Sequence, residues 1–228
     1  MSTIADNLSA LAARIDSAAQ AAGRDPASVQ LLAVSKTKPA SAIREIHAAG
    51  VRDVGENYLQ EALAKQVELD DLPLIWHFIG PIQSNKTKAI AEHFDWVHSV
   101  DRLKIAQRLS EQRPESLAPL NICLQVNVSG EDSKSGCAPA DLPALAQAVA
   151  ALPRLHLRGL MAIPEPTDDR AAQEAAFATL RRLQEGLGLD LDTLSMGMSH
   201  DLEAAIAQGA TWVRIGTALF GARDYGAA

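Results

Sequence analysis

The chain has 228 residues, of which 47% are hydrophobic, 21% are charged and 4% are aromatic. Lysine and arginine total 21 and aspartate and glutamate total 28, so the formal net charge is −7. This composition excludes a collagenous or disordered chain and disfavours nucleic acid or a membrane as the main partner, although it allows a local basic site.

The first 23 residues have the pattern of an amphipathic helix and not of a cleaved leader. They lack a basic start followed by an apolar core, and their apolar residues recur at helical spacing: Ile4, Leu8, Leu11 and Ile15. No apolar run in the chain approaches the roughly 20 residues that span a bilayer.

The chain has only two cysteines, Cys123 and Cys137. Two cysteines are too few for a disulfide framework, and their separation does not fit a metal site. We interpret them as free thiols in a reducing compartment, and we therefore expect a cytoplasmic protein.

Short apolar runs alternate with longer helical patterns along the rest of the chain. The predicted strands cover residues 31–35, 52–55, 75–80, 95–100, 121–128, 155–163, 193–196 and 211–216. The predicted helices cover residues 40–49, 58–69, 84–93, 101–112, 140–151, 170–187, 200–208 and 218–223.

This alternation predicts an α/β fold with parallel strands joined by right-handed crossovers. Eight strands fit a closed (β/α)₈ TIM-type barrel, here preceded by an extra N-terminal helix. An open, doubly wound sheet is the competing fold. The chain contains no linker, so we expect residues 1–228 to form a single barrel domain.

The active site of such a barrel lies at the C-terminal ends of its strands, where Lys36 follows the first predicted strand. Alternation places Lys36 on the same face as Leu32 and Val34. If that face points into the barrel, burial and the neighbouring Lys38 lower the pKa of the Lys36 amine. An uncharged amine can form a Schiff base with an aldehyde. The alternative is an ordinary solvated lysine.

Two loops near the C-terminus predict an anion site. Ser199 is a candidate N-cap of the helix at 200–208, and Gly216 and Thr217 precede the last helix. Backbone N–H groups at helix starts favour phosphate, and barrels often bind it after strands seven and eight. The alternatives are a simple helix cap at Ser199 and a tight turn at Gly216.

Arg214 lies inside the eighth predicted strand, where a guanidinium is costly unless it meets an acceptor. The alternative to a binding role is a buried ion pair with a carboxylate such as Glu56. The six histidines show no HxxxH or HExxH spacing, so we expect no catalytic metal. The polar segment 133–136 is predicted to be a loop after the fifth strand.

Eight blocks of sequence stand in order along the chain: LLAVSKTKP (31–39), GENYLQE (55–61), WHFIGPIQSNK (76–86), HSVDR (98–102), SKSG (133–136), RGLMAIP (158–164), LSMGMSHDLEAAI (194–206) and VRIGTALFGARDY (213–225). With these blocks, the chain closely resembles the pyridoxal phosphate homeostasis proteins, the YggS/PROSC family. That family is similar to the barrel domain of alanine racemases.

The resemblance implies that the cofactor is pyridoxal 5′-phosphate (PLP), carried by Lys36 as a Schiff base. It also implies that the phosphate is bound by Ser199, Gly216 and Thr217. Many relatives have an acidic residue before Asp201, where this chain has His200. The loss of that charge should ease phosphate binding.

The resemblance further implies that Arg214 faces the pyridine nitrogen, and that Asn57 and His77 lie near the ring. An arginine leaves that nitrogen unprotonated, which weakens the ring as an electron sink. Racemisation also needs a second base, which alanine racemases take from another subunit whose chain includes a further β domain. The chain has no residues to spare for such a domain, and its only tyrosines are Tyr58 and Tyr225.

We therefore expect a monomeric PLP carrier without catalytic residues, which takes part in PLP homeostasis and transiently meets apoenzymes. The alternative is a PLP-dependent amino-acid racemase of low activity. A Schiff-base aldolase that has a barrel lysine and no cofactor is a third possibility, in which the phosphate loops would bind a sugar phosphate.

Overall fold

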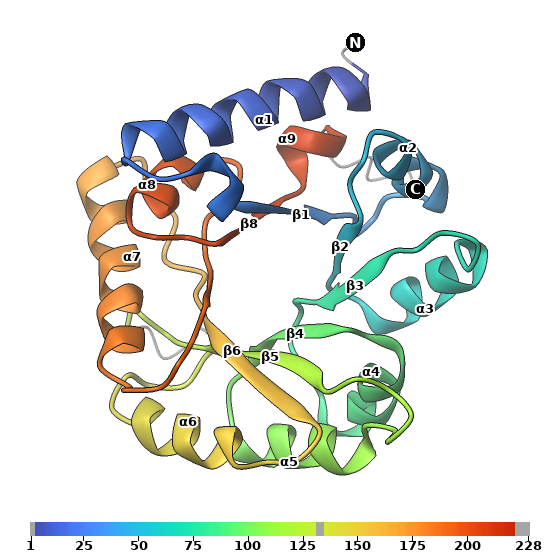
Figure 1. The fold of residues 1–228 in the computed structure, drawn as a ribbon, viewed down its shortest axis with the longest axis vertical. Helices are drawn as coiled ribbons and strands as arrows, with labels where there is room; N and C mark the ends of the chain where they lie inside the picture. Colours follow the sequence, from blue (N-terminus) through green and yellow to red (C-terminus); the bar gives the residue numbers. More distant parts are fainter. Residues whose placement is uncertain (1–2, 131–134, 222–228) are drawn as a thin grey trace, which may run out of the picture.

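The structure is a computed structural model that describes residues 3–130 and 135–221, and its parallel strands form one closed barrel in the order β1 to β8 (Figure 1). The strands are β1 (Gln30–Val34), β2 (Asp53–Glu56), β3 (Ile75–Phe78), β4 (Trp96–Val100), β5 (Leu120–Gln125), β6 (Leu155–Met161), β7 (Thr193–Ser195) and β8 (Trp212–Ile215). The closed (β/α)₈ barrel predicted from the alternation is thus confirmed.

The helices surround this ring of strands (Figure 1). They are α1 (Ile4–Ala21), α2 (Ala40–Ala48), α3 (Leu59–Glu68), α4 (Thr87–His93), α5 (Leu103–Gln112), α6 (Leu142–Ala150), α7 (Arg170–Glu185), α8 (Leu202–Ala207) and α9 (Thr217–Phe220). Short 3₁₀ turns, Pro26–Ser28 and Ser84–Lys86, precede β1 and α4. None of the described helices has both the length and the apolarity needed to cross a membrane.

The pairing of the first and last strands closes the barrel. β1 lies parallel to β8, with Leu32 opposite Arg214 and Ala33 opposite Ile215. Because the strands are parallel, all of their C-terminal ends meet at one rim. Residues just after β1 and β8 are therefore neighbours in space although they lie far apart in the sequence.

The two faces of the sheet bury different sets of residues. Two small clusters contain barrel-facing side chains: Leu32, Val34, Ile79 and Trp212 in one, and Trp96, Cys123 and Met161 in the other. The main core packs the outer face of the sheet against the helices. Leu32 and Val34 belong to the same small cluster, as expected from the alternation along β1.

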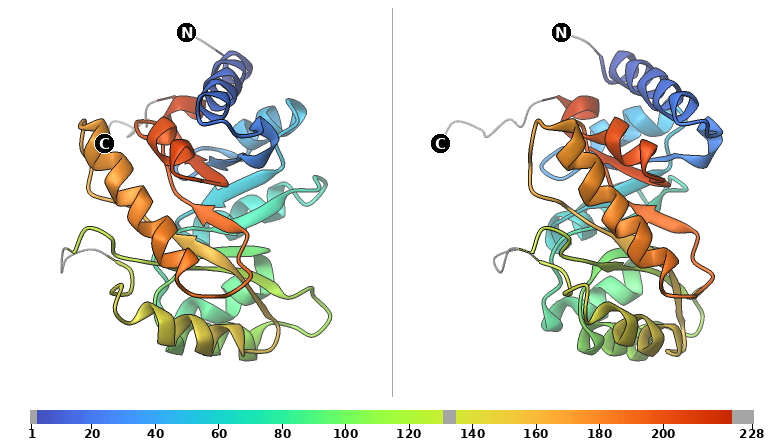
Figure 2. Two further views of the ribbon diagram at one scale, coloured as in Figure 1. Left: turned by 60° about the vertical axis from the view of Figure 1, so that its left-hand side comes forward. Right: turned by 90° about the vertical axis from the view of Figure 1, so that its left-hand side faces the viewer.

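Helix α1 extends past the barrel and packs on α8 and α9 (Figures 1 and 2). A capping box between Thr3 and Asp6 begins the helix. Farther along, Asn7 Nδ2 donates to the Leu219 carbonyl at 2.9 Å, and Arg14 pairs with Glu203 at 2.7 Å. The extra N-terminal helix therefore stabilises the positions of the two C-terminal helices, α8 and α9.

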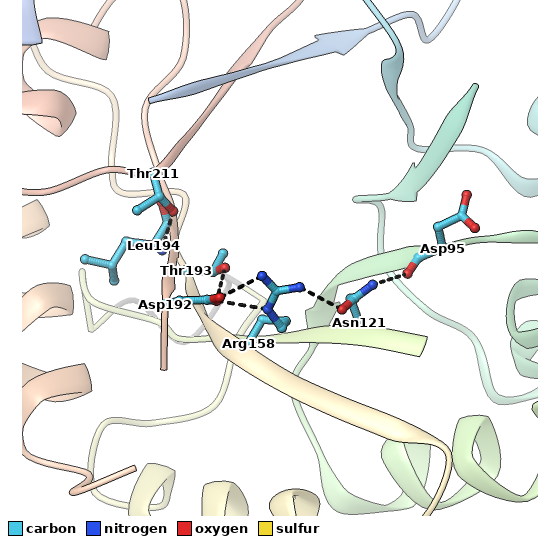
Figure 3. Close-up of polar contacts among 7 residues, drawn as sticks. All are labelled: Asp95, Asn121, Arg158, Asp192, Thr193, Leu194 and Thr211. Carbon is cyan, nitrogen blue, oxygen red and sulfur yellow. Dashed lines mark hydrogen bonds and ion pairs between the residues drawn. The ribbon is translucent and has the colours of Figure 1, made fainter. Parts of the chain in front are cut away.

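A polar network crosses the N-terminal ends of the strands, opposite the rim (Figure 3). Arg158 in β6 donates to both carboxylate oxygens of Asp192 at 2.9 and 2.7 Å and to Asn121 Oδ1 at 3.0 Å. Its guanidinium also lies 4.7 Å from the ring centroid of Trp96. Asn121 Nδ2 in turn donates to the Asp95 carbonyl at 3.1 Å. One side chain thus ties together the beginnings of four strands.

Replacing Arg158 should therefore destabilise the barrel more than replacing an exposed arginine with similar geometry. Arg44 provides the control, since it also makes a bidentate pair, with Asp71, but the Arg44 side chain is 46% exposed whereas that of Arg158 is 25% exposed. We expect Arg158→Leu to lower the free energy of unfolding by about 2 kcal/mol and Arg44→Leu by about 0–1 kcal/mol, measured by urea denaturation. Equal losses would contradict this role of Arg158.

Candidate functional site

A cavity of about 280 Å³ opens at the C-terminal rim of the barrel. Its size is near the lower end of the range for small-molecule sites, about 300–1,000 Å³. Six predicted site residues line it: Lys36, Asn57, Ser199, Arg214, Gly216 and Thr217. They come from β8 and from the loops after β1, β2, β7 and β8. The structure thus brings most of the predicted site together.

Lys36 lies in the turn that follows β1 and is half-buried. Lys38 N donates to the Ser35 carbonyl at 3.0 Å, which closes this turn around Lys36. Thr37 adopts a left-handed backbone conformation with φ 65°, which is rare for a β-branched residue. Such a conformation requires strong local support, and the neighbouring helix provides it.

Helix α3 and the end of β2 hold the backbone on both sides of Lys36. Lys65 Nζ donates to the Ser35 carbonyl at 2.7 Å, and Thr37 N donates to Glu61 Oε1 at 2.6 Å. The Ser35 hydroxyl donates to Glu56 Oε1. The position of Lys36 is therefore fixed through its two sequence neighbours.

The centre of this support is a buried ion pair. Lys65 Nζ lies 2.6 Å from Glu56 Oε1 and 2.6 Å from Glu61 Oε1, and the Lys65 and Glu56 side chains are only 6% and 0% exposed. Burial raises the pKa of the Glu56 carboxyl, while Lys65 and Ser35 oppose that rise. The Lys65 ammonium thus has an oxygen partner for each of its three donors: the Ser35 carbonyl, Glu56 Oε1 and Glu61 Oε1.

Ser199 is not the N-cap of the following helix, so that prediction was wrong. Helix α8 begins at Leu202 with Asp201 as N-cap. Asp201 Oδ1 accepts from Met198 N at 2.6 Å, which holds a turn before the helix and is not a capping hydrogen bond. Ser199 Oγ instead accepts from Ala218 N at 3.3 Å, at the start of α9. This contact joins the two predicted phosphate loops.

Helix α1 also supports these loops, because Arg14 Nη2 donates to the Ser199 carbonyl at 3.1 Å. Helix α9 is shorter than predicted, since it runs from Thr217 to Phe220, and residues 222 and 223 of the predicted helix lie outside the described residues. Tyr225 and part of the predicted loop at 133–136 also lie outside them.

Arg214 is buried in β8, and both of its hydrogen-bond acceptors are neutral. Its Nη1 donates to Ser195 Oγ and its Nη2 to the Ala162 carbonyl, each at 2.9 Å. Burial lowers the pKa of the guanidinium to about 10. The alternative ion pair between Arg214 and Glu56 is wrong, because Glu56 contacts helix α3 on the outer face of the sheet whereas Arg214 lines the cavity.

His77 does not belong to the described lining of the cavity. It is buried in β3, where its Nε2 lies 2.9 Å from Asp53 Oδ1 and its Nδ1 lies 2.9 Å from His98 Nε2. Its ring stacks on Trp96, with the ring centroids 5.5 Å apart. The expected proximity of His77 to a bound ring therefore stays a prediction.

Asn57 combines a fixed backbone with an unused side-chain acceptor. A Cβ atom on Gly80 would lie 2.2 Å from the Asn57 carbonyl oxygen, so only glycine allows the two loops to approach this closely. Within the part of the chain that the structure describes, Asn57 Oδ1 is buried without a hydrogen-bond partner. A ligand hydroxyl or N–H in the cavity would satisfy it.

Several polar residues whose contacts lead to the lining of the cavity were not predicted: Arg14, Ser35, Asp53, Glu61, Lys65, His98 and Ser195. Four of them, Ser35, Glu61, His98 and Ser195, lie in the sequence blocks that carry the family resemblance, which is the signal that could have found them. The other three lie outside those blocks. Over residues 3–130 and 135–221, no group of three or more His, Cys, Asp or Glu side chains could hold a metal ion.

The chain is similar to known proteins over nearly its whole length. Residues 7–224 match the family described as alanine racemase, N-terminal domain. A protein of Pseudomonas aeruginosa named pyridoxal phosphate homeostasis protein is 80% identical, and the match covers 100% of this chain and 99% of that protein. The protein of the same name from Escherichia coli strain K12 is 54% identical, with 99% of each chain covered.

A solved structure also matches over nearly the whole chain. It is that of PipY from Synechococcus elongatus PCC7942 with PLP bound, which is 45% identical. The TM-score is 0.84, and the match covers 96% of this chain and 100% of that one.

Removing Lys65 should leave the buried Glu56 carboxyl without its positively charged partner. We expect Lys65→Met to lower the free energy of unfolding by about 3 kcal/mol at neutral pH. Without Lys65, the folded-state pKa of Glu56 rises further above its unfolded value, so stability is lost as pH rises through that pKa. The deficit measured by urea denaturation should thus be larger at pH 8 than at pH 5.

The double variant Lys65→Met with Glu56→Gln provides the control for this prediction. It removes both charges, so it should recover part of the lost stability and abolish the additional pH dependence. A deficit in Lys65→Met that does not change with pH, or strictly additive losses in the double variant, would contradict the buried pair.

Proposed function

This chain belongs to the family of pyridoxal phosphate homeostasis proteins, which have the alanine racemase N-terminal domain, and on that premise we propose that it binds PLP in the cavity at the barrel rim. The observation that carries the proposal is that an amine, a guanidinium and two donor-rich loops line one cavity: Lys36, Arg214, Ser199 and Gly216 with Thr217. A relative that is 45% identical is known with PLP bound, which supports the proposal.

The residues of the cavity fit the chemical groups of PLP. Lys36 would hold the aldehyde as a Schiff base, while the Ser199 and Thr217 hydroxyls and the N–H groups of their loops would bind the phosphate. Arg214 would face the ring nitrogen, and Asn57 Oδ1 offers a buried acceptor that needs a donor. When bound, PLP supplies an aldehyde that exchanges reversibly between amines.

The protein, in this proposal, carries PLP and does not use it for catalysis. It limits the free aldehyde and releases it to apoenzymes, whose lysines compete for it. Arginine only donates hydrogen bonds, so Arg214 cannot protonate the ring nitrogen in the usual way, and the ring stays a weak electron sink. The homeostasis name of close relatives supports this role.

The alternative, a slow amino-acid racemase, requires a second acid–base group at the cavity. Besides Lys36 and Arg214, the titratable side chains among the described lining residues are Lys38 and His200. His200 lies in the loop proposed for phosphate, and its Nε2 lies 3.4 Å from Asp201 Oδ2. Tyr58 is 56% exposed and does not belong to this lining. These positions favour the carrier.

We place the carrier in the cytoplasm, as a monomer in which residues 1–228 form one PLP-binding domain. Free thiols support a reducing compartment, and both cysteines are free and buried. Burial raises the pKa of Cys123 to about 12 and that of Cys137 to about 11, which keeps both thiols protonated and unreactive.

Lys36→Ala should abolish the imine absorbance of the protein incubated with PLP, because it removes the amine proposed to hold the aldehyde. Trapping with borohydride, followed by mass measurement, should give one PLP adduct in the wild type and none in the variant. Lys88→Ala, which changes an exposed lysine on α4, serves as the control and should trap PLP normally. Persistent trapping in Lys36→Ala would contradict the assignment of Lys36.

Ser199→Ala should weaken PLP binding by about 1–3 kcal/mol, because it removes a hydroxyl from the phosphate loops. Titration followed by absorbance measures this affinity. Ser129→Ala is the matched control, since the Ser129 hydroxyl also accepts from a backbone N–H, that of Glu165 at 2.9 Å, but lies in another loop. If both variants bind PLP as the wild type does, Ser199 only joins the two loops.

A further inference from the structure

A continuous chain of hydrogen bonds runs through the interior of the barrel from Arg214 to Asp53. Arg214 Nη1 donates to Ser195 Oγ at 2.9 Å, and Ser195 Oγ lies 2.7 Å from His98 Nδ1. His98 Nε2 lies 2.9 Å from His77 Nδ1, and His77 Nε2 lies 2.9 Å from Asp53 Oδ1. We call this chain the barrel relay. It links the cavity to the opposite end of the barrel, since Asp53 is the first residue of β2.

The members of the relay between its two ends are buried and uncharged. Ser195, His77 and His98 are fully buried, whereas the Asp53 side chain is 23% exposed. Burial lowers the pKa of His77 and lowers that of His98 well below its usual value; His77 and Arg214 add to the effect on His98. Each imidazole therefore has one N–H donor and one acceptor nitrogen.

The carboxylate at the far end sets the direction of every hydrogen bond in the relay. Asp53 can only accept, so the proton of His77 must be on Nε2, and His77 Nδ1 must accept. His98 then carries its proton on Nε2 and accepts at Nδ1. The Ser195 hydroxyl consequently donates to His98.

The direction of the relay also determines whether Ser195 Oγ offers Arg214 a lone pair or a proton. With its proton directed at His98, Ser195 presents a lone pair to Arg214 Nη1. In the reverse direction, His98 Nδ1 would donate to Ser195, and the hydroxyl proton of Ser195 would have to find another acceptor near the guanidinium. When Ser195 donates to His98, Arg214 therefore has a well-oriented acceptor at Ser195 Oγ. This acceptor matters because Arg214 makes no ion pair among the described residues.

We propose that Asp53 is a positioning residue for the cofactor site, which acts through His77, His98 and Ser195 to orient Arg214 toward the pyridine nitrogen. The proposal rests on the proposed function, because it assumes that PLP binds with its ring nitrogen facing Arg214. It also gives His77 an indirect role at the site.

The sharpest test is Asp53→Asn, which keeps the size of the side chain and can still bond to His77. An amide can either accept or donate, so the variant allows both directions of the relay. Asp192→Asn is the matched control, because it removes a carboxylate at the same end of the barrel that bonds to Arg158 and Thr193 and not to the relay. Urea denaturation checks that both variants are folded.

The first measurement needs no cofactor. In the wild type, ¹⁵N NMR of the imidazoles should show neutral His77 and His98, both protonated at Nε2. Asp53→Asn should give a mixture of tautomers, and Asp192→Asn should match the wild type. A wild-type Nδ1–H tautomer at either histidine would overturn the direction of the relay.

The second measurement compares PLP with its 1-deaza analogue, in which C–H replaces the ring nitrogen. Asp53→Asn should bind PLP about tenfold more weakly than the wild type, as expected for one weakened hydrogen bond to a charged group, and should bind the analogue as the wild type does. Unchanged PLP affinity, or an equal loss for both ligands, would overturn the proposal. If the wild type binds neither ligand, the proposed function fails, whereas the NMR result still tests the relay.

Discussion

The pairing of β1 with β8 is the contact on which the candidate site depends. It places Leu32 opposite Arg214, so the turn that carries Lys36 lies beside the loop of Gly216 and Thr217. Without closure these groups would lie at opposite edges of a sheet. Because closure also requires the seven other strand pairings, the geometry of the site is a property of the whole barrel. Helix α1 strengthens it, because Arg14 pairs with Glu203 of α8 and Asn7 donates to the Leu219 carbonyl of α9.

The barrel buries its charges in two different ways on the two faces of the sheet. On the outer face, Lys65 and Glu56 form an ion pair that supports the turn around Lys36. On the inner face, the hydrogen-bond acceptors of Arg214 among the described residues are neutral, and the carboxylate of its relay is Asp53 at the other end. Among the described residues Arg214 makes no ion pair, so its guanidinium at the cavity is not neutralised by a bonded carboxylate. The acidic net charge of the chain thus coexists with a cationic cavity.

The sequence predicted the architecture well because hydrophobic periodicity records which elements are buried. It also predicted which loops meet, since parallel strands end at one rim. The sequence-based predictions failed for side-chain contacts that depend on which face of a strand a residue occupies, or that join residues far apart in the sequence. Gly55 packs against Leu32, so the adjacent Glu56 faces outward and cannot meet Arg214. The contact between His98 and Ser195 joins residues 97 positions apart, which no local pattern encodes.

The central claim is that the rim cavity holds PLP between Lys36 and the loops after β7 and β8. A crystal structure of the protein grown with PLP tests it most directly. We expect the aldehyde carbon bonded to Lys36 Nζ, the phosphate between Ser199 and Thr217, and the ring nitrogen facing Arg214. A PLP molecule bound elsewhere, or one in the cavity with its phosphate at Arg214, would contradict the account.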